Sequence, residues 1–318
     1  MVNILIYGAG AIGSFVGYLL SQTTRDEVAA IESVALLGRR SHVQTIRNAG
    51  LRICFPEGHR SLICKQCFSS LDELRDSDFF PDLVIVCVKT YSLGRVMGDI
   101  MASGMLNGNL KNADFILLMN GMGNREIFNI SPNNVFEGIT SIGVNFSEDG
   151  SIELKGGGKT VFEDGIGSEI KQFLKERFEE KGFEIEFAKD FRSQQWNKLF
   201  VNSVINPITA LSRKQNSFVL STGLKNTVEG LVDECVNVAY KEGYRADRNA
   251  ILNLVRSVAS ETSANTSSML QDVLKGRMTE IDSINGYLIR RAKKHKIQVP
   301  VNETLYELVK SIEKTRQD

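Results

Sequence analysis

The sequence lacks several features that mark whole classes of protein. Its 318 residues carry 38 Lys+Arg and 38 Asp+Glu, so no net positive field attracts nucleic acid. No apolar run reaches membrane-spanning length without a charged residue, and no signal peptide precedes the first predicted strand. We therefore expect a cytoplasmic protein that binds neither membranes nor nucleic acid. With 42% hydrophobic and 24% charged residues, the chain should form two domains with proper cores.

Cysteine is also scarce, and its pattern excludes common cysteine chemistry. Of the five cysteines, Cys64 and Cys67 form a lone CxxC. Without a second pair or a nearby histidine, this motif does not indicate a zinc site, and its strand-like setting is unlike a thioredoxin-type helix. We predict no bound metal and assign the CxxC no role.

The sequence does contain a glycine-rich motif near its N-terminus, between a predicted strand and a predicted helix. Residues 2–7 form a short β-rich apolar run, and residues 14–20 continue as an apolar helical pattern. A GxGxxG between a strand and a helix is typical of a dinucleotide site, where the helix N-terminal amides face the phosphates. The predicted cofactor-binding residues of this loop are Gly8, Ala9, Gly10, Ala11, Ile12 and Gly13.

The second predicted strand, residues 33–37, indicates which dinucleotide binds. An NAD site usually ends this strand with an acidic residue for the ribose 2′-hydroxyl, and none is present. Arg39 and Arg40 follow instead, and guanidinium groups can grip a 2′-phosphate. We predict NADPH as the cofactor, the alternative being a solvated charge cluster. Residues 23–27 read as a loop insertion that lengthens the spacing from Gly13.

Two further strands end in polar residues. Residues 82–88 lead into Lys89, and residues 115–119 lead into Asn120. Because ligands bind beyond the carboxyl ends of parallel strands, both side chains are predicted to contact cofactor or substrate. The alternative is that they only form turns.

The remaining pattern sets the domain boundary. Residues 152–154 and 160–162 flank three glycines and predict a hairpin that closes the sheet. We expect a Rossmann-type doubly wound α/β domain over residues 1–190, which binds the cofactor. Beyond it the pattern is helical, which predicts an all-helical substrate and catalytic domain over residues 191–318.

An apolar helical run in the second domain carries an unexpected polar stripe. At about 100° per residue, Lys198, Asn202 and Asn206 share one face of the helix. Polar groups in apolar surroundings need partners, and a polar ligand could be that partner. The alternative is that the asparagines satisfy backbone groups freed by Pro207, and that Lys198 reaches water.

A second polar segment lies further along the chain. Residues 262–272 are small and polar and include Ser268. Thr279 is placed to cap a new helix, with Asp282 completing a capping box. Glu280 would then sit in the first turn, where the helix dipole alone accounts for a carboxylate.

Taken together, these motifs resemble those of the ketopantoate reductase (2-dehydropantoate 2-reductase) family from residue 2 to about residue 305. The resemblance rests on GAGAIG at 8–13, VCVKT around Lys89, NGMG from Asn120, WNKLFVNSVINPITAL around Lys198 and SSMLQD…GRMTEID ending near Glu280. It implies a Rossmann domain followed by a helical domain of the 6-phosphogluconate dehydrogenase-like type. It also implies a cleft that holds NADPH and a 2-oxo acid.

The resemblance also implies residue roles. Lys198 is the general acid, and Glu280 engages Lys198 or the substrate hydroxyl. Lys89 lies near cofactor or substrate, and Asn216 matches a further polar position. Substrate binding falls to Asn120, Asn202, Asn206 and Ser268.

The chemistry agrees with a lysine acid. Reducing a ketone requires a hydride at carbon and a proton on the developing alkoxide. The usual histidine acid is not indicated, because His42, His59 and His295 occupy surface-like contexts outside any motif. A partly buried lysine with a lowered pKa can serve instead.

Some alternatives stay open. Residues 137–158 lack a histidine that many relatives carry, so another branched or hydroxylated oxo acid is an alternative to ketopantoate in pantothenate biosynthesis. A non-catalytic NADPH-binding sensor is a second alternative. The sequence allows a monomer or a homodimer.

Overall fold

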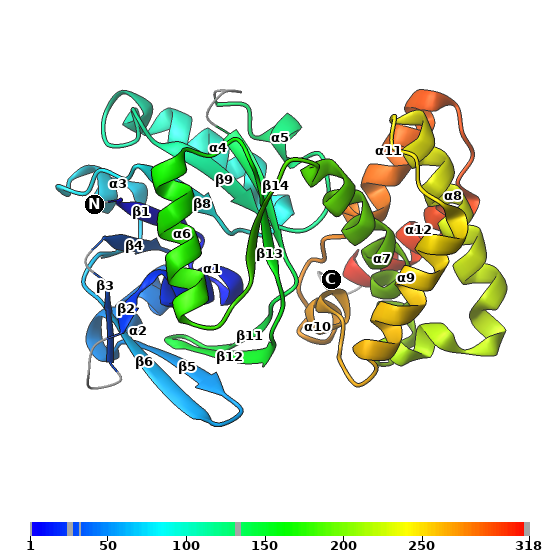
Figure 1. Ribbon diagram of the computed structural model, residues 1–318, viewed down its shortest axis with the longest axis horizontal. Coiled ribbons are helices and arrows are strands. Elements are labelled where there is room, and N and C mark those ends of the chain that lie inside the picture. The colour runs from blue at the N-terminus through cyan, green and yellow to red at the C-terminus, as the bar shows by residue number, and fades with distance from the viewer. Residues whose placement is uncertain (1, 24–27, 32, 131–134, 315–318) are drawn as a thin grey trace. The chain divides into compact units, whose positions relative to one another are not determined.

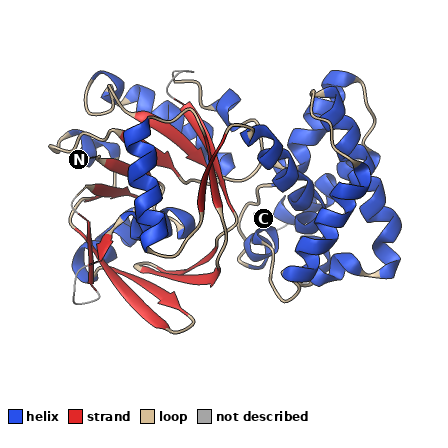
Figure 2. Ribbon diagram, in the orientation of Figure 1, coloured by secondary structure: helices blue, strands red, loops and turns tan. Residues whose placement is uncertain are grey.

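The computed structural model describes residues 2–23, 28–31, 33–130 and 135–314. The chain divides into two compact units, Met1–Met119 with Asn124–Phe191, and Asn120–Gly123 with Arg192–Asp318. The described strands, red in Figure 2, belong to the first unit, whereas the second is built from helices. The predicted succession of an α/β domain and a helical domain is confirmed.

An eight-stranded sheet forms the centre of the first unit. Its strands, in order, are β14 (Ile185–Ala188), β13 (Thr160–Glu163), β10 (Val135–Thr140), β9 (Asp114–Leu118), β8 (Leu83–Val86), β1 (Ile4–Tyr7), β4 (Val34–Leu37) and β7 (Cys67–Phe68). From β10 to β7 all neighbours are parallel, while β13 pairs antiparallel with β10 and parallel with β14.

Helices cover both faces of this sheet, as Figure 1 shows. Successive side chains of a strand point to opposite faces, so Ile4 and Ile6 join one core cluster and Leu5 joins another. The first cluster includes side chains from α1 (Ala11–Leu20) and α6 (Ser168–Glu180), and the second from α3 (Leu71–Arg75) and α4 (Leu93–Ala102). This double burial explains the unbroken apolar runs in the sequence.

A second sheet belongs to the same unit and corrects two predictions. Its strands, in order, are β11 (Gly143–Glu148), β12 (Ser151–Gly156), β5 (Leu51–Phe55), β6 (Gly58–Cys64), β3 (Val28–Ile31) and β2 (Gln22–Thr23). The hairpin predicted across the three glycines is wrong, because β12 pairs with β11 and β5, whereas β13 lies in the larger sheet. Alternating apolar and polar side chains predict a strand, but they do not specify the strand with which it pairs. Of the predicted loop, Thr23 lies in β2, and residues 24–27 lie outside the described residues.

The second unit packs around one long helix, α7 (Phe191–Ser212), which carries the predicted polar stripe. The others are α8 (Lys225–Lys241), α9 (Arg248–Glu261), α10 (Ser268–Leu274), α11 (Asn285–His295) and α12 (Pro300–Lys314), with 3₁₀ turns η4 (Asn216–Leu220), η5 (Thr222–Leu224) and η6 (Ile281–Ser283). Trp196, Leu199, Phe200 and Val204 bury the apolar faces of α7. In the ranges given above, no helix has the length and apolarity needed to cross a membrane.

Candidate active site

The glycine loop joins β1 to α1 as predicted, and it leaves space for a ligand. Gly8 has φ +104°, and a Cβ on Gly13 would lie 2.2 Å from the Gly8 carbonyl oxygen, so both positions require glycine. At Gly10, by contrast, an added Cβ would meet no atom within 4 Å. Gly10 caps α1 without a side-chain hydrogen bond, and the first turn has no acidic residue. This helix end therefore suits a phosphate group.

The two predicted arginines lie beside this loop. The amides of Gly8 and Ala9 both donate to the Leu37 carbonyl at the end of β4, at 2.9 and 3.0 Å. Arg39 caps α2 (Arg40–Ala49), and both Arg39 and Arg40 are exposed. No acidic partner for either is seen in the described part of the chain. Two exposed cationic side chains therefore follow β4 directly beside the glycine loop.

The two strand-end residues lie where the motifs place them. Lys89 is half-buried and caps the 3₁₀ turn η1 (Thr90–Ser92) after β8. Asn120 follows β9 and belongs to the second compact unit. Their contacts with a ligand remain predictions.

The polar stripe on α7 brings a lysine into a desolvated position. Lys198 is half-buried, and burial lowers its pKa from 10.5 to about 8, while the carboxylate of Glu280 acts to raise it. This direction argues against an ammonium group that simply reaches water. Asn202 lies one turn along, and Asn206 a further turn, with only 5% of its surface exposed. Near neutral pH such a lysine is protonated and can readily give up its proton.

The structure also tests whether the asparagines serve Pro207. Pro207 lacks an N–H, so the carbonyl of Ser203 loses its usual helical donor. That carbonyl instead accepts from Asn285 Nδ2 at 3.0 Å. The residue that repairs the helix is therefore Asn285 of α11, and the stripe on α7 does not need this explanation.

The predicted capping box at Glu280 is wrong. Helix α11 begins at Asn285, and Glu280 instead caps the short turn η6. Thr279 Oγ1 accepts from the Ile281 amide at 3.2 Å and donates to Glu313 at 2.6 Å. Glu280 is buried, with only 5% of its surface exposed. Because no long helix starts here, a helix dipole does not account for this buried carboxylate.

A direct contact joins two of the predicted site residues. Asn120 Nδ2 donates to Glu280 Oε2 at 2.9 Å. The loop after Asn120 packs on the same turn, since the Met122 amide donates to the Ser283 carbonyl at 3.1 Å. Gly121 has φ +78°, and a Cβ there would lie 2.4 Å from the Ser283 oxygen. The glycines of the NGMG motif therefore allow the close approach that brings Asn120 to Glu280.

A buried polar network behind α7 was not predicted. Glu234 Oε2 accepts from the Asn302 side chain at 2.8 Å, and Asn302 Oδ1 accepts from Asn285 Nδ2 at 2.9 Å. Asn285 and Asn302 are fully buried. The available signal was polar residues inside apolar helical patterns, the same signal that identified the stripe.

Two other predicted residues, Ser268 and Asn216, also lie in the helical unit. Ser268 is exposed at the start of α10, and its neighbour Ser267 caps that helix by accepting from the Leu270 amide. Asn216 is buried and donates to Thr262 Oγ1 at 2.9 Å. The surface context expected for His42 is wrong, because His42 is fully buried in the first unit.

The cysteines of the CxxC motif are free and buried. Cys67 Sγ donates to the Cys64 carbonyl at 3.3 Å. Within the described ranges, no group of three or more His, Cys, Asp or Glu could hold a metal ion.

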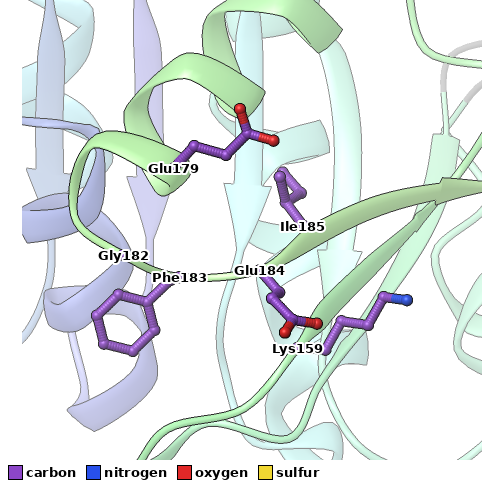
Figure 3. A pocket seen from close by; sticks show the side chains of 6 residues that line it. All are labelled: Lys159, Glu179, Gly182, Phe183, Glu184 and Ile185. Atoms are coloured by element: carbon purple, nitrogen blue, oxygen red, sulfur yellow. The ribbon is translucent and has the colours of Figure 1, made fainter.

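A surface hollow of about 320 Å³ lies at the turn from α6 to β14 (Figure 3). It is lined by Lys159, Glu179, Gly182, Phe183, Glu184 and Ile185. None of these residues belongs to a motif, and Lys159 is ion-paired with Glu186. The hollow therefore contains none of the predicted site residues.

Comparison with known proteins agrees with the motifs. Residues 4–166 match the family model described as ketopantoate reductase PanE/ApbA, and residues 190–313 match its C-terminal counterpart. A 2-dehydropantoate 2-reductase from Pyrococcus horikoshii is 32% identical over 98% of both chains. The crystal structure of a PanE/ApbA family ketopantoate reductase from Ralstonia eutropha has a TM-score of 0.85 at 25% identity, covering 100% of both chains. D-mandelate dehydrogenase in complex with NADH has a TM-score of 0.80 at 25% identity, covering 99% of both.

Proposed function

The chain belongs to the ketopantoate reductase family of NAD(P)H-dependent oxidoreductases, and on that premise we propose that it reduces 2-dehydropantoate to pantoate with NADPH, a step in pantothenate biosynthesis. The observation that carries the proposal is the half-buried lysine of α7, Lys198. Its pKa of about 8, set by burial against the charge of Glu280, is the property that a general acid needs near neutral pH.

The first unit would hold the cofactor. The glycine loop, Gly8 to Gly13, would take the pyrophosphate at the N-terminus of α1, and Arg39 and Arg40 would hold the 2′-phosphate. Lys89 and Asn120 would contact the cofactor beyond the ends of their strands. When bound, NADPH supplies the hydride that the C2 carbonyl of the oxo acid accepts.

The second unit would supply the proton and hold the substrate. As the carbonyl carbon gains the hydride, its oxygen gains the electron pair of the π bond and takes a proton from the Lys198 ammonium. The lysine is left neutral and regains a proton from solvent before the next turnover. Glu280, held by Asn120, keeps the ammonium charged until substrate binds. Amides of Asn120, Asn202 and Asn206 and the hydroxyl of Ser268 would bind the substrate carboxylate and hydroxyl groups.

A second candidate substrate class follows from the likeness to D-mandelate dehydrogenase, since phenylglyoxylate is the oxo acid of mandelate. The test is to follow oxidation of NADPH and of NADH with ketopantoate, phenylglyoxylate and a panel of other branched oxo acids. The proposal expects the highest kcat/KM with ketopantoate and NADPH. A higher kcat/KM with phenylglyoxylate, or with another oxo acid, would identify that compound as the substrate in place of ketopantoate. Tight NADPH binding without turnover of any oxo acid would indicate a sensor and contradict the reductase.

A further inference from the structure

An aromatic ring of the first unit lies against one of the arginines assigned to the cofactor. The Cζ atom of Arg39 lies 5.1 Å from the centroid of the Phe146 ring. Phe146 is on β11 of the smaller sheet, whereas Arg39 precedes α2. A guanidinium group within about 6 Å of an aromatic face is attracted by the negative charge density of the ring. The contact therefore restrains an arginine side chain that is otherwise exposed.

Other parts of the first unit restrain the Phe146 ring. The pairing of β11 with β12 shifts register between Phe146 and Glu148, an irregularity of the kind that re-aims a side chain. The ring of His42 also contacts Phe146, with ring centroids 4.9 Å apart. Phe146 therefore contacts both a buried ring and the guanidinium of Arg39.

The supporting histidine is fixed at both nitrogens. The Gly150 amide donates to Nδ1 at 2.9 Å, so the proton of the neutral ring sits on Nε2 and donates to Ser14 Oγ at 3.1 Å. Burial holds the pKa of His42 below its usual value, so the ring stays uncharged at neutral pH. Ser14 belongs to α1, directly after the glycine loop. The ring that contacts Phe146 is thus linked by a hydrogen bond to α1, the helix that follows the glycine loop.

We infer that Phe146 is a positioning residue for cofactor choice, which holds the Arg39 guanidinium ready for the 2′-phosphate of NADPH. The inference rests on the proposed function, because it assigns Arg39 to that phosphate. An arginine loses side-chain freedom when it binds, and a contact made beforehand reduces that loss. NADH has no 2′-phosphate, so the contact should leave NADH binding unaffected.

The test is a double-mutant cycle on Arg39→Ala and Phe146→Leu, with kcat and KM measured for both cofactors in the intact enzyme. Phe146→Leu should raise KM for NADPH about two- to fivefold, leave kcat unchanged, and leave KM for NADH unchanged. In the Arg39→Ala background, the same substitution should have no further effect. Phe146→Trp should restore the wild-type preference. Phe55, another half-buried ring of the same sheet, contacts Phe15 and Tyr18, so Phe55→Leu serves as the matched control and should leave the preference unchanged.

Each other outcome is decisive. Equal losses with NADPH and NADH would show that Phe146 touches a part common to both cofactors, and would overturn the inference. A reduced preference in Arg39→Ala with no effect of Phe146→Leu would overturn the inference and leave the cofactor assignment standing. An unchanged preference in Arg39→Ala would overturn the assignment of Arg39 and the inference with it.

Discussion

Replacing Glu280 by glutamine should shift the pH dependence of the reaction in a defined direction. The carboxylate of Glu280 acts to raise the pKa of Lys198 against the larger effect of burial. Glutamine is nearly isosteric and can still accept the hydrogen bond from Asn120, so the substitution removes the charge and keeps the packing. Without the charge at position 280, the effect of burial on Lys198 is opposed less, and the pKa of Lys198 should fall below about 8.

The magnitude follows from simple electrostatics. An opposite charge close to a titratable group typically changes its pKa by about 1–3. A general acid works only while protonated, so kcat/KM falls as pH rises through its pKa. In Glu280→Gln this fall should move from about pH 8 to lower pH, by about one pH unit or more.

The assay is the pH profile of kcat/KM for ketopantoate at saturating NADPH. Asp282→Asn is the matched control, because Asp282 lies in the same turn but bonds to Tyr306 and Lys310 of α12. It should leave the fall near pH 8. A Glu280→Gln profile that superimposes on the wild type, or that moves to higher pH, would refute the coupling of the two residues.

Four further changes, one of them a control, test separate parts of the structure. Gly121→Ala should lower kcat/KM by about tenfold or more, because the left-handed backbone and the crowded Cβ displace the loop of Asn120. Gly182→Ala, with φ +76° and open space around its Cβ, should cost about 1 kcal/mol of stability and no activity. Asn285→Ala should lower the free energy of unfolding by about 1–3 kcal/mol in urea titration, because it leaves a buried carbonyl of α7 unpaired. Arg39→Ala combined with Arg40→Ala should reduce the NADPH-over-NADH preference in kcat/KM by at most a few kcal/mol. Unchanged activity in the first, unchanged stability in the third or an unchanged preference in the fourth would contradict these assignments.

Local patterns predicted most of the fold. The glycine loop and its flanking strand and helix form as expected, because each is specified by a contiguous run of residues. The partner of a strand is not specified in this way. Strands β12 and β13 follow each other closely in the sequence, yet they belong to different sheets. Pairing depends on which edges are available in the assembled unit, and alternation of side chains carries no such information.

The candidate site was predictable where one helix carries it, and less so where distant segments meet. The stripe of Lys198, Asn202 and Asn206 follows from helical geometry alone. The contact of Asn120 with Glu280 joins residues 160 positions apart, and no local pattern predicts it. The same limit explains the wrong capping box. Thr279 matches the capping pattern, yet its hydroxyl donates to Glu313, which lies far along the chain.

The central claim is that the ammonium of Lys198 protonates the substrate oxygen, and single-turnover hydride transfer in Lys198→Ala tests it most directly. The variant is preloaded with NADPH, mixed rapidly with ketopantoate, and followed by the loss of reduced nicotinamide. The account predicts a transfer rate lower by about 10²-fold or more, with the Kd for NADPH unchanged. A transfer rate equal to that of the wild-type enzyme, with NADPH bound as tightly, would contradict it.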